Sequence, residues 1–95
     1  MGINISDVVE AVNGRDAGKL FFVVGTEDGS ALIADGAGRR IEKPKKKKFK
    51  HLKPVRAVGG ETAARIAAGD RVTNGELKRA LSGIREAPHE AEGGM

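Results

Sequence analysis

The chain has 95 residues, 14 of them glycine and only 3 aromatic, which is material for one small domain and excludes a multidomain enzyme. It has no cysteine, so disulfide frameworks, thiolate nucleophiles and sulfur-based zinc sites are excluded, and two histidines do not make a metal centre by themselves. The formal net charge of +4 hides an asymmetry, because residues 39–56 hold ten Lys and Arg residues against one acidic residue, Glu42.

The first strands are predicted from apolar runs that end at turn signals. Residues 8–12 are rich in valine and lead into Asn13-Gly14, a strong turn signal. The most apolar run follows this loop, at residues 19–25. Its apolar side chains alternate between two faces, with one set of Leu20, Phe22 and Val24 and another of Phe21 and Val23. Both faces need cover, so we expect this strand to be central.

Two further strands are expected before the lysine run. Asp28-Gly29 predicts a two-residue hairpin turn into a strand at residues 31–34. A tight turn then leads to a short fourth strand at residues 39–42, and Pro44 is expected to interrupt the ladder because proline donates no hydrogen bond. Four strands joined in this way predict a mainly β protein built as a small, strongly bent antiparallel barrel.

The segment after the lysine run has an imperfect alternation. Phe49 and Leu52 are three residues apart, which suits one turn of helix, whereas a strand would place them on opposite faces. In either case, we expect these two apolar side chains to tie the basic segment to the core.

Helical patterns begin near residue 60. The alanine-rich residues 61–68 stop before a capping glycine, and Thr73 with Glu76 forms a capping box at the start of a second helix. That helix carries an apolar stripe that needs a partner surface, made of Leu77, Leu81 and Ile84. The central strand that holds Phe21 and Val23 is one candidate surface, and a partner protein is another.

The expected organisation has three parts. A β module covers residues 1–56 and contains the basic segment 39–56, a helical extension of one or two short helices covers residues 57–87, and residues 88–95 form a disordered tail. The first residues lack the pattern of a secretory signal, and no apolar run approaches the roughly 18 residues of a membrane span. We therefore expect a cytoplasmic protein without membrane contact that is monomeric when free.

The basic segment predicts a polyanionic partner. So many like charges repel one another, and the repulsion falls when a polyanion such as a phosphate backbone supplies countercharge. Each neutralised phosphate releases condensed counterions, so binding to nucleic acid would depend steeply on salt. The alternatives are a solvated loop that only aids solubility, a nuclear import signal, or contact with an anionic membrane surface.

A catalytic constellation is hard to assemble from this sequence. The acidic residues fall in turns and at helix termini, where capping and solubility account for them. His51 lies in the lysine-rich segment, so its best functional use is to stack on a base or hydrogen bond a phosphate, and the alternative is an exposed, idle side chain. We expect no enzymatic activity, no cofactor and no metal.

Residues 13–25, with the valine-rich residues 8–12 before them, resemble the KOW motif. In that family a loop after alternating hydrophobic residues leads to a Gly-Lys pair and an apolar strand, and Gly18 and Lys19 stand at the positions of that pair. More narrowly, residues 6–55 are similar to the KOW modules of archaeal- and eukaryotic-type large-subunit ribosomal proteins and of short bacterial relatives. The resemblance implies an SH3-like barrel and RNA, first of all ribosomal RNA, as the ligand.

Candidate RNA contacts follow from the charges and from this resemblance. Gly14 and Gly18 permit the turn that would bring backbone N–H groups to phosphates, and the guanidinium groups of Arg39 and Arg40 suit base edges or bidentate phosphate contacts. The full set of expected contacts is Arg15, Lys19, Arg39, Arg40, Lys43, Lys45, Lys46, Lys47, Lys48, Lys50, His51 and Lys53. KOW modules of transcription elongation factors also bind protein. The alternative function is therefore an adaptor in transcription or translation whose partner contacts Leu77, Leu81 and Ile84.

Overall fold

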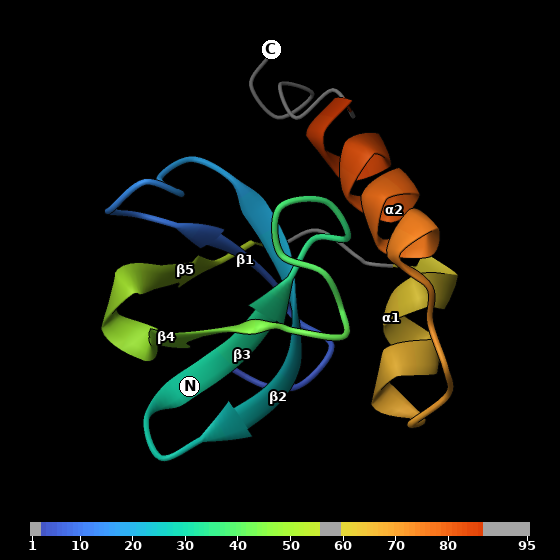
Figure 1. The fold of residues 1–95 in the computed structure, drawn as a ribbon, viewed down its shortest axis with the longest axis horizontal. Helices are drawn as coiled ribbons and strands as arrows, with labels where there is room; N and C mark the ends of the chain where they lie inside the picture. The colour runs from blue at the N-terminus through green and yellow to red at the C-terminus, as the bar shows by residue number, and fades with distance from the viewer. Residues whose placement is uncertain (1–2, 56–59, 87–95) are drawn as a thin grey trace, which may run out of the picture.

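The computed structural model describes residues 3–55 and 60–86. The elements are β1 (Val8–Ala11), β2 (Leu20–Glu27), β3 (Ser30–Ala34), β4 (Lys45–Lys48), the 3-10 turn η1 (Phe49–His51), β5 (Leu52–Pro54), α1 (Gly60–Ala67) and α2 (Asn74–Glu86). The strands form one antiparallel sheet in the order β4-β3-β2-β1-β5. Both helices lie on the same side of this sheet (Figure 1). The prediction of a mainly β fold is confirmed.

The central strand, β2, is covered on both faces, as its alternation predicts. Phe21 and Val23 are fully buried on one face, where they pack with Val9 and Ile33 of the neighbouring strands. Phe22 is fully buried on the opposite face, where it packs with the helices. The helices therefore do not dock on the face of Phe21 and Val23, because the curled sheet itself fills that face.

The sheet is strongly bent, but within the described residues strand pairing does not close it into a barrel. β1 to β4 pair in chain order, and β5 returns to pair with β1, so the two edge strands are β4 and β5. A register shift between Val23 and Gly25 marks a β-bulge, which increases the local twist. The bend brings the Lys47 ammonium of β4 to 3.4 Å from the carbonyl oxygen of Asn13, just beyond β1.

The fourth strand is the lysine run itself, and the strand expected at residues 39–42 is wrong. That segment belongs to a loop in which Asp35 Oδ1 accepts hydrogen bonds from the backbone N–H groups of Ala37 and Arg39, at 2.9 Å each. These local bonds take the place of ladder bonds. Pro44 precedes β4 and so does not interrupt the ladder. β4 lies at a sheet edge, where lysine is tolerated because its charge discourages pairing with further strands.

The segment after β4 combines both of the expected alternatives. Phe49 begins the single turn of η1, and Leu52 begins β5. Leu52 is buried and Phe49 is half-buried against the cluster that contains Phe21. The prediction that these two side chains tie the basic segment to the core is confirmed.

The helix ends follow the capping signals of the sequence. Gly69, with φ of 83°, caps α1, and its N–H donates to the carbonyl oxygen of Ile66 at 3.1 Å. At the start of α2 the Glu76 N–H donates to Thr73 Oγ1 at 3.1 Å, and the Thr73 N–H donates to Glu76 Oε1 at 3.0 Å. The predicted capping box is therefore present.

The apolar stripe of α2 is part of the core. It packs against the outer face of the sheet in one cluster, made of Val8, Phe22, Ala34, Ile66, Val72, Leu77, Leu81 and Ile84. Leu77, Leu81 and Ile84, expected as a possible protein contact, are only 0%, 7% and 9% exposed, so their side chains pack inside the protein and offer little surface to a partner. Residues 56–59 and the tail expected at 88–95 lie outside the described part of the chain. None of the helices described is long and apolar enough to span a membrane.

The start of α2 lies directly against the turn that follows β3. A Cβ atom on Gly36 would collide with the backbone carbonyl of Asn74, and Gly36 has φ of 83°. Asn74 Oδ1 also accepts a hydrogen bond from the Ile41 N–H at 2.7 Å, and its Nδ2 donates to the carboxylate of Glu42. These contacts fix the start of α2 to the loop between β3 and β4.

We expect Leu77→Ala to lower the free energy of unfolding by about 2–5 kcal/mol, because it opens a cavity between α2 and the sheet. Urea unfolding followed by circular dichroism measures the loss. The neighbouring exposed variant Lys78→Ala is the control and should stay within about 0.5 kcal/mol of the parent. Equal stabilities of the two variants would show that α2 is not part of the core.

Gly36→Ala and Gly29→Ala form a matched pair, because both glycines have positive φ, of 83° and 80°. A Cβ on Gly29 meets nothing within 4 Å, so that variant should lose only the backbone strain of about 1–2 kcal/mol. Gly36→Ala should lose about 1–3 kcal/mol more, because it also pushes against the start of α2. Equal losses in urea unfolding would contradict the contact between Gly36 and Asn74.

Candidate nucleic-acid interface

The loop between β1 and β2 lies beside β4 and η1, although these segments are far apart in sequence. The Val12 N–H donates to the His51 carbonyl oxygen at 3.0 Å, and Asn13 Nδ2 donates to His51 Nδ1 at 2.8 Å. With Nδ1 as the acceptor, the ring proton sits on Nε2. The half-buried His51 ring is therefore held in one orientation, with Nε2–H left to donate to another acceptor.

Asp16 is a buried carboxylate that gathers cations from three elements, and sequence reasoning missed it. Its side chain is only 10% exposed. The Arg39 Nη2 atom lies 3.1 Å from Asp16 Oδ2, and the Lys19 Nζ atom lies 4.0 Å from Asp16 Oδ1. The signal that could have found it is a lone acid inside a glycine-bounded loop that also carries basic residues. We call Asp16, Lys19, Arg39 and Lys47 the loop cluster.

The loop cluster keeps Asp16 ionised and still leaves a surplus of positive charge. Burial by itself raises the pKa of Asp16, but the hydrogen bond and the charge of Arg39 lower it, and the charges of Lys19 and Lys47 lower it further. The net result is a pKa below the ordinary value of 3.8. One carboxylate thus faces three cations, so the cluster attracts a further anion.

Alternation along β4 sends its lysines to two faces. Lys45 and Lys47 lie opposite buried residues of β3 and are half-buried, so their aliphatic stems cover the core while their ammonium groups reach the surface. Lys46 and Lys48 are exposed on the other face. The lysine run is therefore held on an ordered strand, paired with β3 along its length.

Only some of the cations expected to contact RNA form ion pairs with acidic side chains of the protein itself. Outside the loop cluster, Arg40 pairs with Glu42 at 3.3 Å and Lys46 with Glu27 at 3.2 Å. All four side chains are at least half exposed, and such surface pairs contribute only about 0–1 kcal/mol, so another anion displaces them readily. The other expected cations outside the loop cluster form no ion pair within residues 3–55 and 60–86, and these are Arg15, Lys43, Lys45, Lys48, Lys50 and Lys53. We call them the unpaired cations.

The glycines of the β1–β2 loop have the predicted conformation, but the loop backbone is less available than expected. Gly14 and Gly18 have φ of 81° and 88°, which favours glycine at both positions. Backbone N–H groups in this loop donate to carbonyl oxygens of the chain itself, namely those of Ala17, Gly18 and Lys19 to Gly14, Ala11 and Asp16. These three donors are already used, so cationic side chains would carry the contacts to phosphate.

Side chains that could ligate a metal do not cluster in the part of the chain that the structure describes. No three His, Asp, Glu or Cys side chains gather there in a way that could hold a metal ion. The described carboxylates near the loop cluster are engaged by cations or by backbone N–H groups.

Asp16→Asn should lower the free energy of unfolding at pH 7 by about 1 kcal/mol, because Arg39 loses its ionic partner. The folded-state pKa of Asp16 is depressed, so its contribution is complete above the ordinary value of 3.8 and is lost as the pH falls through the lower folded-state pKa. Urea unfolding at several pH values should therefore show a parent-variant difference that shrinks below pH 3.8. The exposed hairpin variant Asp28→Asn is the control, and a pH-independent difference for Asp16→Asn would contradict the cluster.

Comparisons with known proteins do not assign this chain to a family. No family model matches the sequence, and no curated protein matches it significantly. The functional conclusion therefore depends on the chemistry of the loop cluster, the unpaired cations and the strands that hold them.

Proposed function

We propose that this chain is a non-enzymatic RNA-binding protein that acts in the cytoplasm on structured RNA, with ribosomal RNA as the first candidate. The observation that carries the proposal is the set of unpaired cations, four of which lie on the ordered elements β4, η1 and β5, together with a loop cluster that has surplus positive charge. Phosphate groups relieve the repulsion among these side chains, and the released counterions add to the affinity.

The order of the lysine run favours a binding surface over a solvated loop. β4 pairs with β3 from Lys45 to Lys48, and η1 and β5 then anchor the chain in the core through Phe49 and Leu52. The backbone that carries the cations is thus fixed before any partner arrives. Less conformational entropy is lost on binding when the backbone is already fixed, so more of the electrostatic energy appears as affinity.

The relation to KOW modules and their SH3-like barrel is part of the proposal. β1 to β4 pair in chain order, β5 returns to β1, and the two edge strands are joined through η1, an arrangement that suits a sheet curling toward a barrel. Gly18, at the position of the motif glycine, has φ of 88°, a value that favours glycine. These features support a KOW-like loop presented by a bent sheet.

The expected mode of binding is contact with the RNA backbone and its shape. Lysine ammonium groups act as point charges toward phosphates, whereas Arg39 is oriented by Asp16 and presents a fixed guanidinium plane. His51 adds the Nε2–H donor described above. The adaptor alternative is less favoured, because the side chains proposed for a protein partner are buried in the core.

The test compares two double variants that each remove two positive charges from exposed positions. Lys48→Gln with Lys50→Gln removes one unpaired cation at the end of β4 and one in η1, and Arg71→Gln with Arg79→Gln removes charges from the helical side. Binding to a fluorescent RNA hairpin is measured by anisotropy across a range of salt concentrations. The first variant should weaken binding and flatten the slope of log affinity against log salt by about 1.5, because roughly 0.7–0.9 is lost per phosphate contact.

The control variant should keep the parent slope. A flat slope for the parent protein, or equal effects of the two double variants, would overturn the proposed interface. Co-sedimentation with ribosomes, which Lys48→Gln with Lys50→Gln should reduce, then tests whether ribosomal RNA is the ligand.

A further inference from the structure

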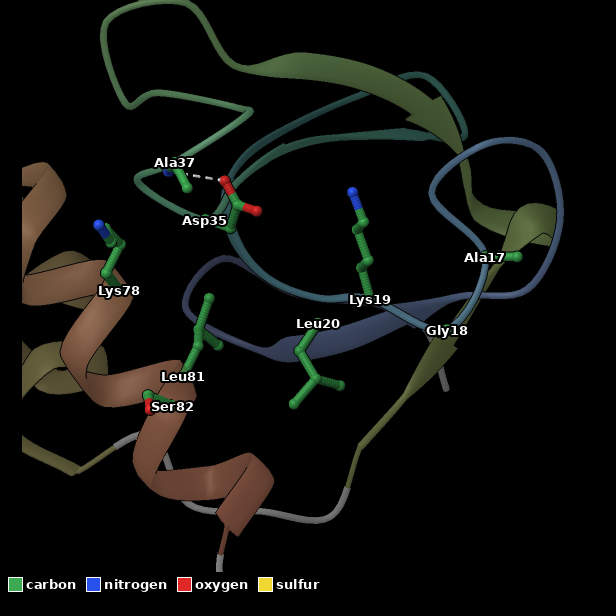
Figure 2. A pocket seen from close by; sticks show the side chains of 9 residues that line it. All are labelled: Ala17, Gly18, Lys19, Leu20, Asp35, Ala37, Lys78, Leu81 and Ser82. Carbon is green, nitrogen blue, oxygen red and sulfur yellow. Dashed lines mark hydrogen bonds between the residues drawn. The ribbon is translucent and has the colours of Figure 1, made fainter.

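A groove of about 510 Å³ lies between the end of the β1–β2 loop and α2 (Figure 2). Each side carries one lysine, with Lys19 on the side of the sheet and Lys78 on α2. Leu20 and Leu81 lie between these lysines, and the turn after β3 adds the carboxylate of Asp35. The size falls in the range of sites that bind small organic groups.

This lining fits the chemistry of a single nucleotide. Leu20 is half-buried beside the core cluster that contains Leu81, so a flat base laid against Leu20 removes apolar surface from water. Lys19 and Lys78 on the two sides would meet the phosphates before and after that base. Lys19 also belongs to the loop cluster, so RNA bound there passes the mouth of the groove.

Asp35 supplies a hydrogen-bond acceptor at the groove. Its Oδ1 atom is occupied by the N–H groups of Ala37 and Arg39, whereas Oδ2 has no hydrogen-bond partner in the described part of the chain. Figure 2 shows this second oxygen on the side of the turn toward Lys19. A carboxylate oxygen accepts from the exocyclic amino groups of adenine, cytosine or guanine. Uracil has no such group, and its one ring donor, N3–H, lies between two carbonyl oxygens that repel a carboxylate.

We infer that the groove receives one unstacked nucleotide of the bound RNA and prefers a base with an amino group over uracil. The inference rests on the proposed function, because it adds a base contact to an interface that otherwise touches the backbone. The chain has no Trp or Tyr, so the Leu20 side chain takes the place of an aromatic stacking surface. Unstacking costs least at a nucleotide that is already unpaired, so a single-nucleotide bulge is the expected target.

The experiment uses the full chain and four RNA hairpins that differ at one position. The hairpins carry a bulged adenosine, a bulged uridine, a bulged abasic residue or no bulge. The adenosine bulge should bind about five- to tenfold more tightly than the fully paired hairpin, and the uridine and abasic bulges should gain less than about twofold. Equal affinities for the three bulged hairpins would overturn the inference, because a bulge that only opens the helix requires no base.

Two variants with equal loss of charge locate the contact. Lys78 lines the groove, whereas its neighbour Arg79 lies outside it. Lys78→Gln should abolish the gain from the adenosine bulge, and Arg79→Gln should keep it. Equal effects of the two variants would show that the groove is not used.

Asp35→Asn tests the base contact itself. The asparagine oxygen keeps the two turn hydrogen bonds, and its NH2 group replaces Oδ2 with a donor. The preference for adenosine over uridine should then shrink, because the NH2 group cannot accept from the adenine amino group. An unchanged preference for adenosine would overturn the role of Asp35.

The two proposals fail in different ways. Tight, salt-dependent binding to all four hairpins with no preference for a bulge overturns the inference and leaves the proposed function standing. Absence of binding to every hairpin at low salt overturns the proposed function.

Discussion

The burial of β2 on both faces is the constraint on which the rest of the structure depends. The curled sheet covers Phe21 and Val23, and the helices cover Phe22. Neither face of the central strand is left for a partner, so the sites described here lie at the sheet edge, in the loops and at the seam between the sheet and α2. These are the places where the cations collect.

The position of the helices determines the geometry of the turn after β3 and of the groove beside it. Asn74 holds the start of α2 against the turn after β3, and that turn carries both Asp35 and Arg39. The same packing that completes the core therefore sets the distance between α2 and the β1–β2 loop. The groove lies at this seam, lined by residues of the loop, of the turn and of α2.

The Asp16 carboxylate interacts with several cationic side chains but does not neutralise all of their charge. Asp16 fixes Arg39 across two loops and draws Lys19 toward it, yet the β4 and β5 edges keep their unpaired cations. A polyphosphate partner stabilises such an arrangement, and a neutral partner does not. The buried carboxylate thus orients Arg39, while the proposed affinity for RNA rests on the lysines around it.

Local signals in the sequence determined the strands at residues 8–12 and 19–25 and the Asp28-Gly29 hairpin. They also determined the helix caps and the positive φ of the glycines in the β1–β2 loop. Turns and caps depend on residues that are close in the chain, so the sequence alone shows them. The sequence also located the cationic segment, because its charge follows from composition and does not depend on the fold.

Only the tertiary structure decided that the lysine run is an edge strand, since an edge needs one paired neighbour and little hydrophobic pattern. It also decided which face of β2 the helices cover, and that Asp16 is buried beside Arg39. Periodicity shows that both faces of a strand are apolar, but it does not say what covers each face. That choice depends on contacts between residues far apart in the chain.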